Sequence, residues 1–183
     1  LILKRYKLKK LNFTKTEQMV PYVDQMFYLL GKTYDKLQTF VPIQDYQIDH
    51  YKNRFLKYIN PGFIKCVTDE NDELVAFAIT MPSFSNALKK INGKVDLIAK
   101  LRLLHAKNFN HKGSLYLIGV RPDFQNKGVI AILFNELQKF YNKFGITEVE
   151  TNPELIENTA IQQLWKNYEN NQHKNRATFT KEI

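Results

Sequence analysis

Apolar residues recur along the first third of the chain with two different periods. Residues 2–13 alternate loosely between apolar and basic side chains, a pattern that predicts an edge strand. Over residues 16–30 the apolar positions recur at helical spacing, which predicts an amphipathic helix. A second stretch of this kind covers residues 45–59 and ends at Asn60-Pro61-Gly62. We therefore expect two helices after the edge strand.

The middle of the chain carries two short apolar runs, Phe63–Val67 and Leu74–Thr80, separated by the polar turn 69–72. This pattern predicts an antiparallel hairpin. The second run is unbroken, which predicts that its strand is buried on both faces of a sheet. Helical spacing returns over about residues 83–109, where we expect two short helices.

The last third of the chain alternates strands and helices. We expect a strand at Leu115–Val120, a long helix after Gly128, a short strand at Thr147–Thr151, a helix over about residues 154–170 and a last strand at Arg176–Lys181. This order predicts an α/β fold with helices around one mixed sheet. The length of 183 residues fits a single domain, residues 1–183.

The stretch Leu115–Ala131, LYLIGVRPDFQNKGVIA, joins a strand to a helix through a turn that contains Lys127 and Gly128. The first backbone N–H groups of a helix lack partners within the helix and carry partial positive charge. Such a junction is suited to a phosphate or pyrophosphate, and a glycine lets the phosphate approach the backbone closely. The alternative is an ordinary strand-to-helix turn, because short glycine motifs often match by chance.

The chain carries 27 Lys and Arg against 18 Asp and Glu, a formal net charge of +9. This charge attracts anions, namely nucleic acid, acidic lipids or a multiply phosphorylated cofactor. Neither an RNA-binding signature nor zinc-finger spacing accompanies it, so we favour a solvated basic surface over a nucleic-acid site. The longest apolar runs are too short to span a membrane, and we expect no membrane partner.

The cysteine and histidine content predicts a reducing environment and no metal. Cys66 is the single cysteine and lies within an apolar run, which predicts a buried structural thiol in a cytoplasmic protein. The histidines lack the spacing of metal ligands, so we expect no zinc or other metal site. They are His50, His105, His111 and His173.

The strand-to-helix junction resembles the acyl-CoA-binding motif of the GNAT N-acetyltransferases. This motif reads Gln/Arg-x-x-Gly-x-Gly/Ala after a strand that ends V-x-P, and the matching residues are Val120, Pro122, Gln125 and Gly128. Ile130 stands where the motif has Gly or Ala. The order of predicted elements also resembles the GNAT fold, a central mixed, mostly antiparallel twisted sheet flanked by helices. Here a helical insertion precedes the motif strand. The resemblance implies acetyl-CoA, or another acyl-CoA, as co-substrate.

A second resemblance lies in the C-terminal third. GNAT proteins carry Asn-x-x-Ala-x-x-x-Tyr after the next strand, and this chain has Asn158, Ile161 and Trp165 at these positions. Four segments resemble an uncharacterised bacterial GNAT-like subgroup, namely VRPDFQNKGV, ETNPELIEN, LWKNYE and QHKNRATFTKEI. Helix surface is the alternative for Asn158, and a core position is the alternative for Trp165. The resemblance implies these cofactor-binding residues: Ile118, Gly119, Val120, Gln125, Asn126, Lys127, Gly128, Val129, Ile130, Asn158 and Trp165.

The implied reaction moves an acyl group from CoA to an amine, which must be neutral to attack. The resemblance places the thioester carbonyl near the backbone N–H of Ile118 or Val120, which would stabilise the developing oxyanion. Glu150 is the candidate base, and Glu148 shares its face of the strand. The family often uses a Tyr as acid where this chain has Trp165, so Tyr168 is the candidate acid, with Tyr116 as the other tyrosine that could replace it.

Three functions remain open at this point. The first is an N-acyltransferase, a monomer or homodimer, that acylates a primary amine of an unknown small molecule or peptide. The second is a non-catalytic acyl-CoA-binding module or one half of a tandem GNAT protein. The missing Tyr favours it, as does the start at Leu1, which suggests the C-terminal part of a longer protein. The third is a basic nucleic-acid-binding domain, which rests on charge alone.

Overall fold

The computed structural model describes residues 1–35, 40–56, 59–94, 96–156, 158–177, 179 and 181. The chain divides into two compact units, Leu1–Glu150 and Thr151–Ile183, and each is described by itself. The first unit contains nearly all of the sheet and, among the described residues, all of the buried hydrophobic side chains. The described part of the second unit contains the short helix α7 (Thr159–Trp165).

The sheet has five strands in the order β1-β2-β3-β4-β5. They are β1 (Lys9–Asn12), β2 (Ile64–Thr68), β3 (Leu74–Pro82), β4 (Lys112–Val120) and β5 (Glu148–Thr151). The β1–β2, β2–β3 and β3–β4 pairs are antiparallel. β5 joins β4 at its start, where the backbone N–H groups of Thr147 and Glu148 donate to the carbonyl of His111 at 2.8 and 3.2 Å. The predicted mostly antiparallel sheet is confirmed.

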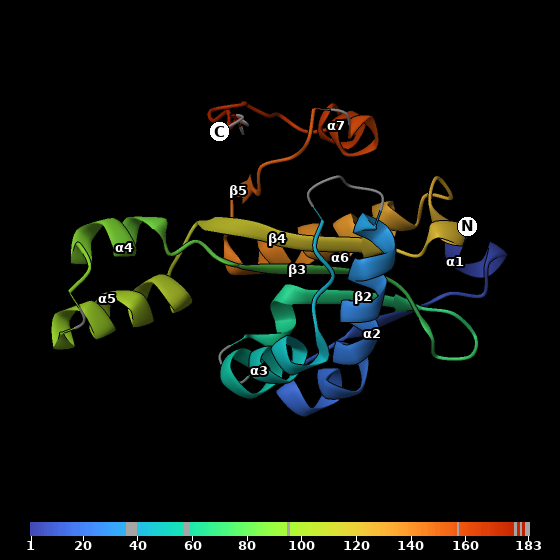
Figure 1. The fold of residues 1–183 in the computed structure, drawn as a ribbon, viewed down its shortest axis with the longest axis horizontal. Helices are drawn as coiled ribbons and strands as arrows, with labels where there is room; N and C mark the ends of the chain where they lie inside the picture. Colours follow the sequence, from blue (N-terminus) through green and yellow to red (C-terminus); the bar gives the residue numbers. More distant parts are fainter. Residues whose placement is uncertain are drawn as a thin grey trace. The chain divides into compact units, whose positions relative to one another are not determined.

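Helices cover both faces of this sheet (Figure 1). The helices of the first unit are α1 (Ile2–Arg5), α2 (Thr16–Tyr34), α3 (Asp45–Phe55), α4 (Ser85–Ile91), α5 (Leu97–Asn108) and α6 (Val129–Phe144), with short 3-10 turns at Pro61–Phe63 and Pro122–Phe124. One core cluster packs α6 against the sheet, and the other packs α2 against the opposite face. β3 contributes to both clusters, which confirms its predicted burial on two faces.

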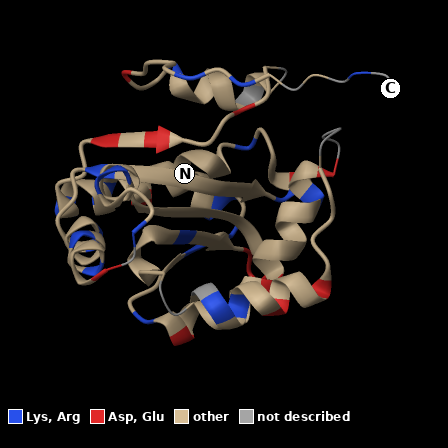
Figure 2. Ribbon diagram, turned by 60° about the vertical axis from the view of Figure 1, so that its left-hand side comes forward, with Lys and Arg blue, Asp and Glu red and all other residues tan. Residues whose placement is uncertain are grey.

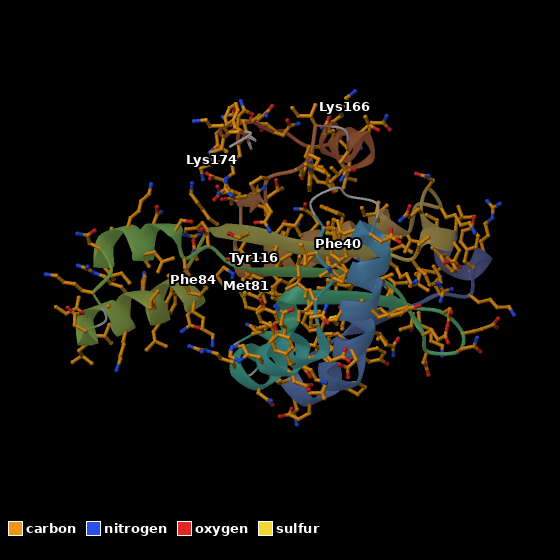
Figure 3. All side chains as sticks on the ribbon, viewed as in Figure 1. Phe40, Met81, Phe84, Tyr116, Lys166 and Lys174 are labelled. Atoms are coloured by element: carbon orange, nitrogen blue, oxygen red, sulfur yellow. The ribbon has the colours of Figure 1, made fainter. Side chains whose placement is uncertain are left out.

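The central strands differ in regularity. In the β3–β4 register Ile79 pairs with Leu117 but Thr80 pairs with Leu115, so Tyr116 is an extra residue in β4. Such a bulge bends a strand and disrupts the ladder locally. Tyr116 is exposed at this point of β4 (Figure 3). The bulge therefore lies between the start of β4, where β5 is joined, and the end of β4 that leads to the turn at Pro122.

The N-terminal segment differs from its prediction. The structure has the short helix α1 followed by β1, in place of one edge strand over residues 2–13. Ile2, Leu3 and Tyr6 pack against the α6 core cluster. Their spacing of one and four residues places them on one side of a helix. Burial of this side against the core favours the helix over the strand that the alternation of apolar and basic residues predicted.

The C-terminal segment also differs from its prediction. The helix expected over about residues 154–170 is limited to Thr159–Trp165. Of the strand expected at Arg176–Lys181, residues 176, 177, 179 and 181 are irregular, and 178 and 180 lie outside the described residues. The described side chains within residues 176–181 are exposed, so the pattern there has no buried face of a strand to form.

Candidate functional site

The loop between β4 and α6 presents backbone donors at one point. Asn126 and Gly128 both have left-handed backbone conformations, with φ of 59° and 75°. Gly128 is the N-cap of α6. The Ala131 N–H donates to the Gly128 carbonyl at 3.2 Å, while the N–H groups of Gly128, Val129 and Ile130 have no acceptor within the described residues. Such unpaired donors at a helix N-terminus are suited to an anion.

The side chains of the loop have separate roles. Gln125 is exposed, and its Nε2 donates to the Val120 carbonyl at 3.2 Å. Val129 is 1% exposed and belongs to the α6 core, so only its backbone can meet a ligand. Lys127 is exposed, and its Nζ lies 5.4 Å from the ring centre of Tyr6 and 5.1 Å from that of Phe124. Cation–π contacts with these two rings therefore orient the Lys127 side chain.

Gly128 is also required by a neighbour outside the loop. A Cβ at this position would lie 2.7 Å from Cδ1 of Ile2. The α1 helix therefore packs directly on the turn, and glycine is needed for this contact as well as for the positive φ. A larger residue at Gly128 would force the Ile2 side chain to move as well as change any phosphate site.

Arg121 attaches this loop to the β2–β3 turn. Its backbone N–H donates to the Val75 carbonyl at 2.8 Å, and its guanidinium donates to Asp69 at 3.0 Å and to Asp123 at 2.9 Å. Burial alone would raise the pKa of the Asp69 carboxyl, but hydrogen bonds from Arg121 and from two backbone N–H groups outweigh it and lower that pKa. Sequence reasoning did not identify this link, because nothing local pairs Arg121 with a turn 52 residues earlier.

The end of β4 has two outward-facing backbone positions. Since Arg121 forms a backbone bond to β3, alternation in an antiparallel pair turns the N–H and C=O of Ile118 and Val120 away from β3. In agreement, the Ile118 carbonyl accepts from the Tyr34 hydroxyl at 3.0 Å, and the Val120 carbonyl accepts from the Thr33 hydroxyl at 3.4 Å. Tyr34 and Thr33 are site residues that sequence reasoning missed.

Gly119 lies between these two positions and faces a bulky neighbour. An ideal Cβ at Gly119 would lie 2.5 Å from Cε1 of Phe77, its partner in the β3–β4 register. The glycine therefore allows the Phe77 ring to lie against β4. Its contribution to a ligand site is limited to the backbone.

The catalytic candidates of the first unit lie on β4 and β5. Glu150 is half-buried in β5, whereas Glu148 is exposed and forms an ion pair with Lys112. This pairing gives Glu148 a structural partner at the start of the strand. Tyr116 is at the bulge of β4. Glu150 is therefore the carboxylate on β5 that remains a candidate base.

Three predicted site residues belong to the second unit. Asn158 is the N-cap of α7, although its side chain accepts no capping hydrogen bond. The Trp165 indole N–H donates to both carboxylate oxygens of Glu154, at 2.9 and 3.1 Å. Tyr168 lies beside it, with 6.3 Å between the ring centres. The assignment of these three residues to the cofactor or to catalysis stays a prediction.

A cavity of about 650 Å³ lies between α2 and α3. Five residues of α2 line it, namely Asp24, Phe27, Tyr28, Gly31 and Lys32, and they share one side of the helix with Asp35. Met26 and Leu30, on the other face of α2, pack on the sheet. The cavity therefore lies on the side of α2 that faces away from the sheet, and we do not assign it to the site at Ile118 and Val120.

Within the described residues, histidine, cysteine and carboxylate side chains form no group that could hold a metal ion. In the same part of the chain, every helix is too short or too polar to cross a bilayer.

Comparisons with known proteins identify the family. The sequence matches the Acetyltransferase (GNAT) family over residues 25–167. Among curated proteins no significant match was found. Solved structures with the same fold include an aminoglycoside acetyltransferase from an uncultured soil metagenomic sample in complex with sisomicin, which is 12% identical with a TM-score of 0.56 and 99% coverage of both chains.

Two further structures are similar at this level. The aminoglycoside acetyltransferase AAC(6')-Iy, in complex with a bisubstrate analogue of CoA, is 13% identical with a TM-score of 0.53, covering 96% of this chain and 97% of that one. The ribosomal-protein-alanine N-acetyltransferase of Brucella melitensis biovar Abortus 2308 is 12% identical with a TM-score of 0.52, covering 94% and 97%. The family match spans most of the sequence, including β4, its loop and α6, so this chain belongs to the GNAT family of acetyltransferases, which transfer an acyl group from acyl-CoA to an amine.

Proposed function

We propose that the loop 125–130 and the N-terminus of α6 bind the pyrophosphate of acetyl-CoA, and that the outer edge of β4 binds its pantetheine arm. The observation that carries this proposal is the set of three N–H groups, from Gly128, Val129 and Ile130, without an acceptor in the described chain. Two left-handed residues and the adjacent Lys127 support it. These features fit a diphosphate, which needs several donors and a nearby cation.

The outward-facing N–H groups of Ile118 and Val120 are suited to the rest of the cofactor. Extended amide groups can pair with the open edge of a strand. One of these N–H groups would then donate to the thioester oxygen as it gains negative charge. Glu150, on β5, would accept a proton from the attacking amine, directly or through water. Tyr168 remains the proposed acid that protonates the departing thiolate.

The acceptor is proposed only as a primary amine of a small molecule or peptide. Similar folds serve aminoglycoside and ribosomal-protein acetyltransferases, at identities that support the fold alone. An acceptor screen should therefore contain aminoglycosides, simple polyamines and peptides with a free N-terminus. Release of CoA from acetyl-CoA, measured for each amine, would identify the class.

Calorimetric titration with acetyl-CoA tests the cofactor site. We expect wild-type binding, and about tenfold weaker binding by Lys127→Glu, because a charge-assisted contact would become a repulsive one. Lys143→Glu is the matched control, since Lys143 is an exposed lysine in the last turn of the same helix. Lys127 is a better probe than Gly128, where any side chain would also meet Ile2.

The outcomes separate the enzyme from a binding module. Acetyl-CoA binding with amine-dependent CoA release supports the enzyme. Binding without release for any amine in the screen would favour the non-catalytic module, which Trp165 in place of Tyr also favours. A folded wild-type chain that binds no acetyl-CoA, or equal weakening in both lysine variants, would contradict the proposed site.

A further inference from the structure

The helices α4 and α5 form a hairpin that extends from one end of the sheet (Figure 1). Asn92 and Gly93, both with positive φ, form the turn after α4. The Asp96 carboxylate caps α5 by accepting from the Ala99 N–H at 2.7 Å, and the Arg102 guanidinium donates to the Lys90 carbonyl at 2.9 Å. These local bonds give the hairpin a defined shape although few residues of the main body contact it.

One face of α5 packs within the hairpin, and the opposite face is apolar and exposed. Ala99 is buried, and Leu103 and Ala106 are half-buried on its side of the helix. At 100° per residue, Leu97, Leu101 and Leu104 fall within about 60° of one another on the outer side. The large apolar side chains of the hairpin that are 53–73% exposed are Leu88, Leu97, Ile98, Leu101, Leu104 and Phe109. We call Leu97, Leu101 and Leu104 the outer leucine face.

Cations border the outer leucine face on both sides. The hairpin carries six lysines and arginines against one acid, Asp96, which already serves as a helix cap. The six are Lys89, Lys90, Lys94, Lys100, Arg102 and Lys107, and all are exposed. Figure 2 colours the lysines and arginines blue along the ribbon. By helical position, Lys100 and Lys107 flank the apolar face of α5 on one side, and Arg102 flanks it on the other.

We infer that the outer leucine face docks on the surface of an anionic lipid bilayer. An apolar stripe with cationic borders is the pattern of helices that lie in the membrane interface, with leucines among the acyl chains and cations at the headgroup phosphates. A second copy of the chain would bring the same excess of positive charge against this face. Nucleic acid would satisfy the cations but leave the leucines in water.

This inference changes the sequence-based expectation of no membrane partner, which considered only segments that cross a bilayer. It does not depend on the acetyl-CoA site, because no residue of the outer leucine face belongs to the β4–α6 loop. Surface docking would hold the enzyme beside amines carried by or near the lipid.

Vesicle flotation with the full chain tests the inference. We expect the wild type to float with vesicles of equimolar phosphatidylcholine and phosphatidylglycerol, and not with phosphatidylcholine alone. Lys100→Glu and Lys107→Glu should each weaken binding at least about fivefold, the effect of one lost cation near an anionic surface. Lys143→Glu, with the same change in net charge, should bind like the wild type.

Variants of the apolar face provide the second arm. Leu101→Glu should abolish flotation, whereas Val41→Glu, which also replaces an exposed aliphatic residue, should not. Equal flotation with both vesicles, no flotation, or flotation of Leu101→Glu at the wild-type level would overturn the inference. If the chain binds no vesicles and forms a dimer that Leu101→Glu abolishes, the face binds a second copy of the chain. If it binds no vesicles and is a monomer, the face is assigned to a different protein partner.

Discussion

Two glycines of the first unit have opposite surroundings. A Cβ on Gly119 would lie 2.5 Å from the Phe77 ring, whereas a Cβ on Gly31, within α2, would meet nothing within 4 Å. We expect Gly119→Ala to lower the free energy of unfolding by about 1–3 kcal/mol, the usual cost of overpacking a core. Urea unfolding followed by circular dichroism measures the change.

Gly31→Ala is the matched control for that variant. Alanine should raise the free energy of unfolding by about 0.5–1 kcal/mol, because glycine inside a helix has excess backbone freedom in the unfolded chain. Equal effects of the two substitutions would contradict the close approach of Phe77 to β4.

Tyr34 joins α2 to the outward-facing edge of β4. Tyr34→Phe removes the 3.0 Å hydrogen bond from its hydroxyl to the Ile118 carbonyl, at a cost of about 1 kcal/mol in stability. Because the Ile118 N–H is a proposed donor to the thioester, we also expect kcat to fall more than the KM for acetyl-CoA rises. Steady-state kinetics with an amine found in the screen checks this.

Tyr22→Phe serves as the control on the same helix, since the Tyr22 ring packs on Phe13, 5.8 Å away between ring centres. It should leave kcat unchanged. If Tyr34→Phe alters stability alone, its hydroxyl has only a structural role.

At the scale of elements, the link from Arg121 to Asp69 fixes the loop after β4 to the turn after β2. The pKa of Asp69 is lowered in the folded protein, so its carboxylate stabilises the fold when ionised. That contribution is complete above the pKa of an unfolded Asp, about 3.9, and is lost as the pH falls through the lower folded value. Asp69→Asn should therefore lower the free energy of unfolding at neutral pH. Below about pH 5, the further decrease of this free energy should be smaller than in the wild type.

Glu70→Gln is the control in the same turn. The ion pair between Glu70 and Lys7 is exposed on both sides, so its removal should change stability little. Unfolding curves between neutral pH and about pH 3 compare the three proteins. Parallel acid profiles for wild type and Asp69→Asn would show that the link does not stabilise the fold.

Elements with strong local signals were predictable from the sequence. α6 runs from Val129 to Phe144 between two left-handed glycines, Gly128 and Gly145, and its start agrees with the prediction. The β2–β3 hairpin was predicted from its polar turn. The predictions failed where long-range packing decided the outcome, as in α1, whose helical form depends on burial of Ile2 against α6.

In the candidate site, too, features encoded by local sequence were predictable and features that depend on long-range contacts were not. The loop 125–130 was predictable, because a strand, a turn and a helix start are adjacent in sequence. Tyr34 and Arg121 were not, because their partners lie 84 and 52 residues away and their side chains match no local motif. Roles within the second unit, including that of Tyr168, remain predictions.

At the scale of the whole molecule, the two core clusters meet through the central strands of one sheet. Cys66, the single cysteine, lies in β2 and is 1% exposed. Burial raises the pKa of its thiol, which further lowers the fraction of reactive thiolate. Labelling of Cys66 should therefore require opening of the sheet that both clusters stabilise.

The rate at which N-ethylmaleimide modifies Cys66 at neutral pH, followed by mass spectrometry, measures this opening of the sheet. We expect native labelling to be at least about a thousandfold slower than labelling in urea, given a domain stability of about 5 kcal/mol or more. Acetyl-CoA at about 100 times its Kd should slow it about another hundredfold, because the ligand binds only the folded chain. Lys127→Glu should lose much of that protection, while Lys143→Glu should keep it. Labelling of the native protein at the rate found in urea would mean that β2 opens without unfolding of the two cores. If native labelling is slow and acetyl-CoA does not slow it further, the proposed cofactor site is contradicted, without any assay for turnover.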